Sequence, residues 1–229
     1  MRVISKPAIL KFAEGHHDAL APLMNWYRIT RRADWGSLAE VRSDFAHADI
    51  VGRRTVFNIH GNTYKLITRI NYKNQTRVHS VHPHPCRVQQ GSLEAMSTTT
   101  EIRDSVYAEL LAKSLPRPIR TDAERARFAE TLLGLDDRED LSPEEEALAE
   151  VLTLLIEDYE EKNYPLPRVS PNESLNALME ERGLKHKDIW PVLGNKGAAT
   201  EVLSGRRSIS KAQAKRLAEF LHVPIELFV

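Results

Sequence analysis

The chain has 229 residues, of which 41% are hydrophobic and 28% are charged, and this is enough for two globular domains. It contains no run of 18 apolar residues, which excludes a transmembrane helix, and its first residues lack the apolar stretch of a secretory signal. The only cysteine, Cys86, cannot form an internal disulfide and fits a reducing compartment. We therefore expect a cytoplasmic protein without a membrane partner.

A formal net charge of zero conceals three blocks of different sign. Residues 1–90 hold 14 Lys and Arg against 6 Asp and Glu, a net charge of +8. Residues 91–172 hold 9 against 19, a net −10, and residues 173–229 hold 9 against 7, a net +2. A basic surface suits nucleic acid, and the acidic block is expected to compete for that surface by complementarity.

Residues 1–77 predict a small α+β domain. After a short strand signal at residues 3–4, apolar spacing indicates a helix to about Gly15, a second helix capped by Asp18, and a helical piece over residues 35–45. The period then changes to two, which predicts antiparallel strands at 50–51, 55–59 and 64–72 with a hairpin turn at 60–62. Helices followed by a meander are typical of an α+β domain.

Several spaced motifs in this domain resemble the HigB toxins of type II toxin–antitoxin systems. They are Met1-Arg-Val-Ile-Ser5, Trp26-Tyr27, Ala33-Asp34-Trp35, Ala48-Asp49-Ile50-Val51-Gly52 and Phe57-Asn58-Ile59-x-Gly61-Asn62-x-Tyr64. The resemblance covers residues 1 to about 77. It implies a RelE-like fold and a messenger-RNA interferase that cleaves codons on the ribosome.

The same resemblance suggests which residues contact RNA. Lys65 matches a family position that is usually arginine, and Arg69 matches a basic position on the same strand. Basic side chains on the sheet of such a ribonuclease hold phosphates and stabilise developing negative charge. We interpret Arg53 and Arg54, which precede the neighbouring strand, as solvated residues.

The junction at residues 78–95 departs from the toxin pattern, which usually ends in an apolar strand and a Thr-His-Ala-Glu-Tyr motif. Codons allowed by residues 78–90 spell that ending when they are read one base further on. Our hypothesis is that a frame shift near Arg77 replaced the last strand and bypassed the stop codon. The spacing of His79, His82, His84 and Cys86 is not a usual zinc pattern, so we expect no metal and no other cofactor.

Residues 96–164 predict an acidic helical region that starts at Met96, the former start of a second gene. Apolar stripes indicate a helix after Glu101 and a second helix from Thr121. A long third helix is expected from Leu141-Ser142-Pro143-Glu144 to about Tyr164. We interpret the acidic residues of this third helix as a solvated face. A proline-rich linker follows at 165–173. From Met96 onward the chain resembles a HigA antitoxin, whose helical region accompanies a DNA-binding C-terminal domain.

Residues 174–229 predict four short helices that resemble the lambda-repressor-like helix-turn-helix family. The resemblance lies in Gly194, the run 201–207 and the tail 217–224. The third helix is capped by Asn195 and would enter the major groove by its N-terminal end, and Ser210 opens the fourth helix. The expected base-facing residues are Asn195, Lys196, Thr200 and Glu201, and the expected phosphate contacts are Arg206, Arg207 and Lys211. Gly197, Ala198 and Ala199 leave few long side chains there, so sequence-specific affinity is expected to be modest.

Together these segments predict an α+β RelE-like domain followed by an all-α region with a helix-turn-helix. The first functional interpretation is a fused toxin–antitoxin protein that binds operator DNA as a homodimer, represses its own gene and carries a truncated, neutralised toxin. A second is an active messenger-RNA endonuclease, with ribosome and messenger RNA as partners, held in check by its tethered antitoxin. A third is a transcription regulator with a sensing domain, against which the basic first block argues.

Overall fold

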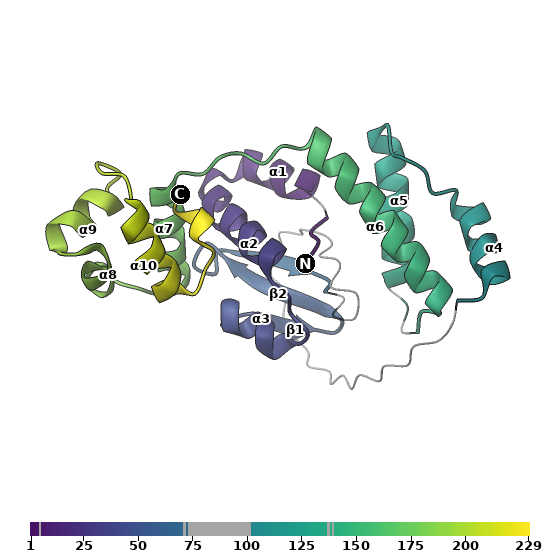
Figure 1. The fold of residues 1–229 in the computed structure, drawn as a ribbon, viewed down its shortest axis with the longest axis horizontal. Helices are drawn as coiled ribbons and strands as arrows, with labels where there is room; N and C mark the ends of the chain where they lie inside the picture. Colours follow the sequence, from purple (N-terminus) through teal and green to yellow (C-terminus); the bar gives the residue numbers. More distant parts are fainter. Residues whose placement is uncertain (5, 71, 73–101, 137, 139) are drawn as a thin grey trace.

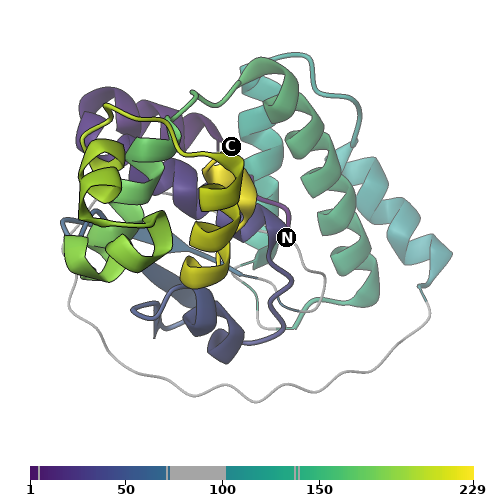
Figure 2. The ribbon, with the colours of Figure 1, turned by 60° about the vertical axis from the view of Figure 1, so that its left-hand side comes forward.

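The computed structural model describes residues 1–4, 6–70, 72, 102–136, 138 and 140–229. An α/β domain lies in the middle of the molecule, between two helical parts (Figure 1). Helices α4 to α6 lie at one end and helices α8 to α10 at the other, with α7 against the α/β domain. Figure 2, turned by 60°, gives the same arrangement.

Three helices and a three-stranded sheet form the α/β domain. Its elements are α1 (Lys6–Gly15), η1 (His17–Ala19), α2 (Leu20–Arg32), α3 (Leu38–Asp44), β1 (Asp49–Val51), β2 (Arg54–Ile59) and β3 (Tyr64–Thr68). The sheet is antiparallel in the order β1-β2-β3, with Val56 opposite Ile67 and Asn58 opposite Lys65. The predicted α+β class and its three antiparallel strands are therefore confirmed, although β3 ends at Thr68 and not at residue 72 as expected.

The core of this domain is built on Phe57, which is fully buried in the middle of β2. The rings of Trp26, Trp35 and Phe45 lie 5.6, 6.3 and 5.1 Å from the Phe57 ring, centroid to centroid. Large aromatic side chains contribute most to such a core, because each buries much apolar area. Helix α2, the connection that follows it and the end of α3 are thereby fixed on one face of the sheet.

Helices α4 (Asp104–Ser114), α5 (Asp122–Asp136) and α6 (Pro143–Asn163) form the acidic region. Ser142 caps α6 as predicted, and it forms a capping box with Glu145. The acidic face of α6 is only partly solvated, because Glu144 and Glu160 are 0% and 1% exposed. Our interpretation of these carboxylates as solvated was wrong for both residues, since each accepts hydrogen bonds from another segment.

Four short helices complete the chain. They are α7 (Pro171–Glu181), α8 (His186–Leu193), α9 (Lys196–Leu203) and α10 (Lys211–Leu221), followed by η2 (Ile225–Leu227). The predicted caps are observed at Asn195 and Ser210. Helix α7 begins three residues before the expected Ser174, because Ser170 caps it and Pro171 occupies its first turn.

The α/β domain shares a continuous core with these last helices. Leu175, Leu178 and Met179 of α7 are buried in the same cluster as Trp26 and Ile29 of α2. The Asn25 side-chain amide donates a buried hydrogen bond to the Ser174 carbonyl oxygen, at 2.9 Å. Each buried side chain of this size stabilises the contact by about 1.5–3 kcal/mol. The two parts are therefore packed together, not merely linked.

Three local predictions were wrong. Asp18 does not cap α2, whose N-cap is Ala19 without a side-chain hydrogen bond, because the Asp18 carboxylate instead accepts from the Tyr64 hydroxyl at 3.0 Å. The apolar tail after Val223-Pro224 also led us to expect Ile225 in the core, but Ile225 is 37% exposed. The expected strand at residues 3–4 is reduced to an isolated bridge at Arg2. None of the helices among the described residues is both long and apolar enough to cross a bilayer.

The buried Glu144 carboxylate gives a testable pH dependence. Hydrogen bonds from the Arg103 side chain and backbone, at 3.0 and 2.9 Å, lower the pKa of Glu144 to about 2. A lowered folded-state pKa contributes stability that is present above the ordinary pKa and is lost as pH falls through the folded one. Arg103→Gln is therefore expected to lower the melting temperature at pH 7, and this difference should shrink between pH 4.5 and 2.

Lys113→Gln provides the control, because Lys113 is an exposed residue of α4. It should leave the melting temperature unchanged at both pH values. An Arg103→Gln effect that is the same at every pH would show that Arg103 stabilises the chain by packing and not through the Glu144 charge.

Candidate nucleic-acid interfaces

The sheet of the α/β domain has one buried face and one open face. Thr55, Phe57, Ile59, Leu66 and Thr68 are buried toward the helices. Side chains alternate along a strand, so the intervening residues face the other way. The open face therefore carries Lys65, which sequence reasoning selected, together with Val56, Asn58 and Ile67.

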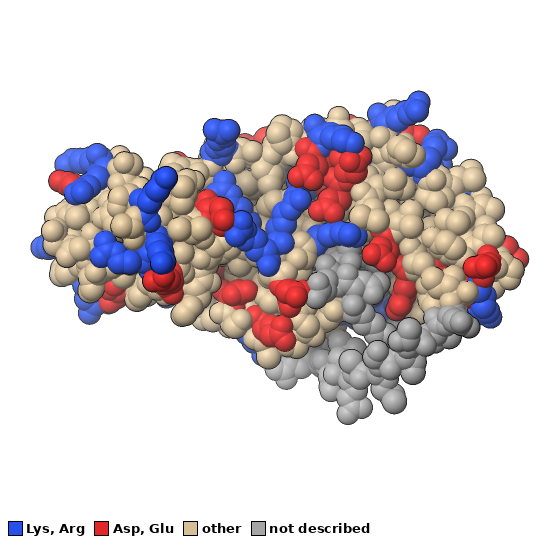
Figure 3. Space-filling view, viewed as in Figure 1, with Lys and Arg blue, Asp and Glu red and all other residues tan. Residues whose placement is uncertain are grey.

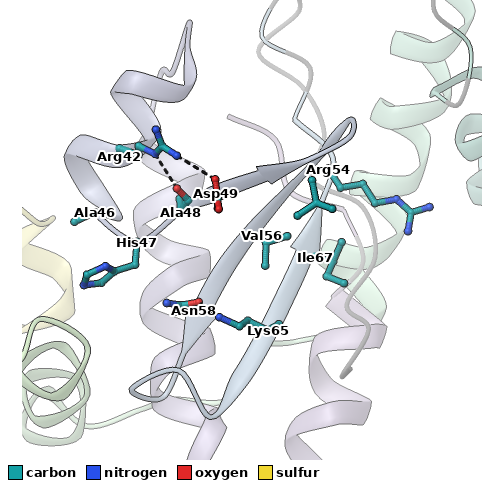
Figure 4. A pocket seen from close by; sticks show the side chains of 11 residues that line it. Arg42, Ala46, His47, Ala48, Asp49, Arg54, Val56, Asn58, Lys65 and Ile67 are labelled. Atoms are coloured by element: carbon teal, nitrogen blue, oxygen red, sulfur yellow. Dashed lines mark hydrogen bonds and ion pairs between the residues drawn. The ribbon is translucent and has the colours of Figure 1, made fainter. Parts of the chain in front are cut away.

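A cavity of about 570 Å³ lies on this open face (Figure 4). The strands contribute apolar and polar residues side by side, and the segment between α3 and β1 forms a wall. The lining residues are Arg42, Ala46, His47, Ala48, Asp49, Val51, Arg54, Val56, Asn58, Lys65 and Ile67. The cavity is open, mixed in character and bordered by positive charge, which suits a phosphate-bearing ligand.

Lys65 is held in place at the hairpin end of this cavity. Its ammonium group donates to the side-chain oxygens of Asn58, its partner across the strands, and Asn62, which lies in the turn. Asn62 has a φ of 80°, a left-handed conformation that asparagine tolerates better than most residues. Two amide oxygens thus fix the ammonium group without neutralising its charge.

The other predicted basic residues are distributed differently. Among the described residues, Arg69 and Arg53 do not line the cavity, although both have interactions elsewhere. Arg54, which we interpreted as solvated, does line it, but its side chain extends away from Lys65 (Figure 4). Arg42 forms part of the rim, where it donates to the Ala48 carbonyl at 2.9 Å and pairs with Asp49 at 3.1 Å.

A second hollow continues from the first toward α7. It shares Ala46, His47, Ala48 and Asn58 with the first cavity, and Glu181 and Arg182 at the end of α7 form its other wall. Burial raises the pKa of the Glu181 carboxyl to about 7. His47 and Glu181 were missed by sequence reasoning, and only the position of His47, just before the Ala48–Gly52 motif, gave a local signal.

Where the α/β domain meets α6, basic side chains of the domain lie against acidic side chains of the helix (Figure 3). Arg31 pairs with Glu157 at 3.7 Å and with Glu161 at 3.4 Å. Arg2 pairs with Glu157 at 3.5 Å. In the described residues, the α6 carboxylates thus meet the basic block beside α1 and α2, whereas Lys65 lies on the opposite side of the sheet from these helices.

The second candidate interface is the exposed side of α9. Asn195 uses its side chain to accept from the Ala198 backbone at 2.8 Å, so it acts as the predicted cap. Lys196 lies with its ammonium group 5.6 Å from the centre of the Trp190 ring. Thr200, Glu201, Arg206, Arg207 and Lys211 are all exposed. Glu201 pairs with Arg207 at 3.6 Å, which brings one expected base-facing residue together with one expected phosphate contact.

The predicted junction and its histidines and cysteine have no described position. Residues 78–95, including His79, His82, His84 and Cys86, lie outside the described residues. The frame-shift hypothesis therefore stays a prediction.

Comparison with known protein families finds a similarity within the α/β domain. Residues 19–84 match the HigB toxin family, the RelE-like toxic component of a toxin–antitoxin system. The match takes in α2, α3 and the whole sheet, and it ends at residue 84, beyond residue 77 where we expected the resemblance to stop. A search of curated proteins finds no match. Residues 19–84 thus resemble the HigB toxin family, and the function of the helical remainder has to be argued from its own residues.

Proposed function

We propose that the chain is a fused toxin–antitoxin protein, in which residues 96–229 act as a HigA-type antitoxin and operator-binding repressor. The observation that carries this proposal is the packing of the toxin domain against the rest of the chain. Helix α7 shares a buried core with α2, and α6 meets Arg2 and Arg31 through carboxylates. An antitoxin has to bind its toxin through such complementary surfaces.

The proposed DNA-binding unit is the helix-turn-helix formed by α8 and α9. Support comes from the short α8–α9 connection at Gly194 and from the exposed side of α9 at its capped N-terminal end. Lys196 and Arg206 place positive charge at the first turn of α9 and just beyond its end. Because α7 contacts α2 while the α9 residues are exposed, the same chain can bind DNA and keep its toxin domain packed.

DNA binding is tested by single substitutions in the full chain. Lys196→Ala or Arg206→Ala is expected to weaken binding to the upstream DNA of the chain's own gene, by about 1–3 kcal/mol if a base-edge contact is lost. Fluorescence anisotropy against labelled DNA at fixed salt measures this change. Lys162→Ala is the matched control, because Lys162 is 68% exposed on α6, in the acidic region. Unchanged binding by both variants would remove the assignment of α9.

We expect the chain to bind DNA as a homodimer, because one short helix offers few base contacts. Two half-sites about one turn of the DNA helix apart would double the number of these contacts. Sedimentation of the protein–DNA complex counts the chains on one operator. A single chain bound with full affinity to one isolated half-site would contradict this expectation.

A second candidate function is an active ribosome-dependent messenger-RNA endonuclease restrained by its antitoxin half. The observation that favours it is the cavity on the sheet, which is open and exposes the lysine that the toxin resemblance selects. We favour the neutralised form, because the general acid and base expected from the His-Ala-Glu-Tyr ending are absent from the sequence.

A further inference from the structure

The segment before α1 has neighbouring residues in two different cores. Val3 is 2% exposed and packs in the cluster that contains the sheet of the toxin domain. Ile4 is 1% exposed and packs in the other cluster, among side chains of α5 and α6. Its partners there include Phe128, Leu132 and Leu152. The toxin domain thus inserts one side chain into the core of the acidic helices.

Polar contacts surround this insertion. Arg2 pairs with Glu157 at 3.5 Å and with Glu150 at 4.0 Å. On the other side of Ile4, the Lys6 backbone N–H donates to Glu160 at 3.0 Å. Glu160 is 1% exposed and also pairs with Arg125 of α5 at 3.5 Å. A buried carboxylate needs such partners, so Glu160 ties the start of α1 to both acidic helices.

The core of α5 and α6 is small without Ile4. Its other fully buried members are Phe128, Leu132, Leu148, Ala149, Leu152 and Ile156. Removing a side chain from such a cluster leaves a cavity or exposes its apolar lining to water, and either outcome is unfavourable. The helical pair is therefore incomplete as a folding unit until the toxin domain supplies the missing residue.

We propose that α5 and α6 form a specific binding socket for the amino-terminal segment of the toxin domain, and that filling this socket controls the folding of the acidic region. The socket accepts an aliphatic side chain, that of Ile4. It also recognises Arg2, two positions earlier, through an ion pair with Glu157. Because the contact lies beside α1, it anchors the acidic helices without occupying the cavity near Lys65. The proposal rests on the proposed function only for naming the two halves toxin and antitoxin.

Amide hydrogen exchange in the full chain tests the socket with two adjacent substitutions. Ile4→Ala is expected to lower the protection of α5 and α6 amides by about tenfold or more, while the β2 and β3 amides keep theirs. Val3→Ala is the matched control, and it should lower protection in β2 and β3 and spare α5 and α6. Equal loss of protection in both regions from either substitution would overturn a separate socket.

Charge reversal tests the recognition of Arg2. Arg2→Glu and Glu157→Arg should each lower the protection of α6, and the double variant should lie closer to the wild type than either single variant. Lys11→Glu, an exposed residue of α1, controls for the change in net charge. Additive effects in the double variant would show that Arg2 and Glu157 do not recognise each other. Neither hydrogen-exchange experiment depends on DNA binding or on cleavage of RNA. Failure of the socket and failure of the proposed function can therefore be told apart.

Discussion

Expression of the full chain is expected to cause no growth arrest and no ribosome-dependent cleavage of messenger RNA. Two causes act together. The histidine and tyrosine of the expected toxin ending are absent, and cleavage needs positioned groups for proton transfer. In addition, the half that we propose to be an antitoxin is tethered to the α/β domain, which gives it a high effective concentration.

The two causes are separated by comparing two shorter chains, of which the first rebuilds the toxin ending. A chain of residues 1–77 followed by the alternate-frame ending should restore toxicity, because it regains the missing groups and lacks the helical half. Arg69→Ala and Lys65→Ala are each expected to abolish that toxicity, whereas Lys11→Ala, an exposed change on α1, should not. Primer extension on cellular messenger RNA reads the cleavage directly.

Residues 1–95 without the restored ending complete the design. This fragment loses the packing of α7 on α2, so circular dichroism must first show that it folds. A folded fragment is expected to be harmless. Cleavage by it would show that Lys65 and Arg69 suffice, and a folded but harmless restored toxin would contradict the assignment of an interferase activity to this domain.

Elements that depend on local signals could be predicted from the sequence. The caps at Ser142, Asn195 and Ser210 were expected because a side-chain oxygen there satisfies free backbone N–H groups of the following helix. The strands β1 to β3 followed from the change of period from helical spacing to two, and the glycine at position 61 marked the turn. Such signals lie within a few residues of the feature that they determine.

Contacts between distant segments could not be predicted in the same way. The hydrogen bond from Asn25 to Ser174 spans 149 positions, and the one from Lys6 to Glu160 spans 154. Nothing in the neighbourhood of Glu160 distinguishes it from the solvated glutamates of α6, because its partners come from α1 and α5. The same reason explains why Ile4 was assigned to a strand of the toxin domain and not to the core of the acidic helices.

The candidate site was predicted only in part. Lys65 was selected through the toxin resemblance, and its place on the cavity agrees with the alternation of β3. Glu181 could not be selected, because it reaches the hollow next to Asn58 only when α7 packs on the toxin domain. A residue contributed by tertiary packing has no pattern of its own in the sequence.

Glu181→Gln is expected to stabilise the chain at pH 8 and to have little effect at pH 4. Burial raises the pKa of Glu181 from about 4.5 to about 7, and the nearby Arg182 offsets this only in part. An acid whose folded-state pKa is raised binds its proton more tightly in the folded chain. Its contribution to stability is therefore full below pH 4.5, falls as pH rises from 4.5 to 7, and is absent above.

The size of this effect follows from the shift. One pKa unit corresponds to 1.36 kcal/mol, so the wild type should lose at most about 3 kcal/mol of unfolding free energy between pH 4 and pH 8 through Glu181. Glutamine has the same shape without the charge and should regain most of this loss at pH 8. Urea unfolding at the two pH values, followed by tryptophan fluorescence, measures the difference because Trp26 and Trp35 are buried in the folded chain.

Glu180→Gln is the matched control, because Glu180 is the preceding residue of α7, is 52% exposed and pairs with His60 at 3.2 Å. Loss of that exposed pair should change stability little, and it should bring no gain at pH 8. A Glu181→Gln variant that is destabilised at pH 8 would mean that the carboxylate has a favourable partner in the packed chain. A gain at pH 8 alone would instead show that ionisation of Glu181 destabilises the folded chain as pH rises toward 7.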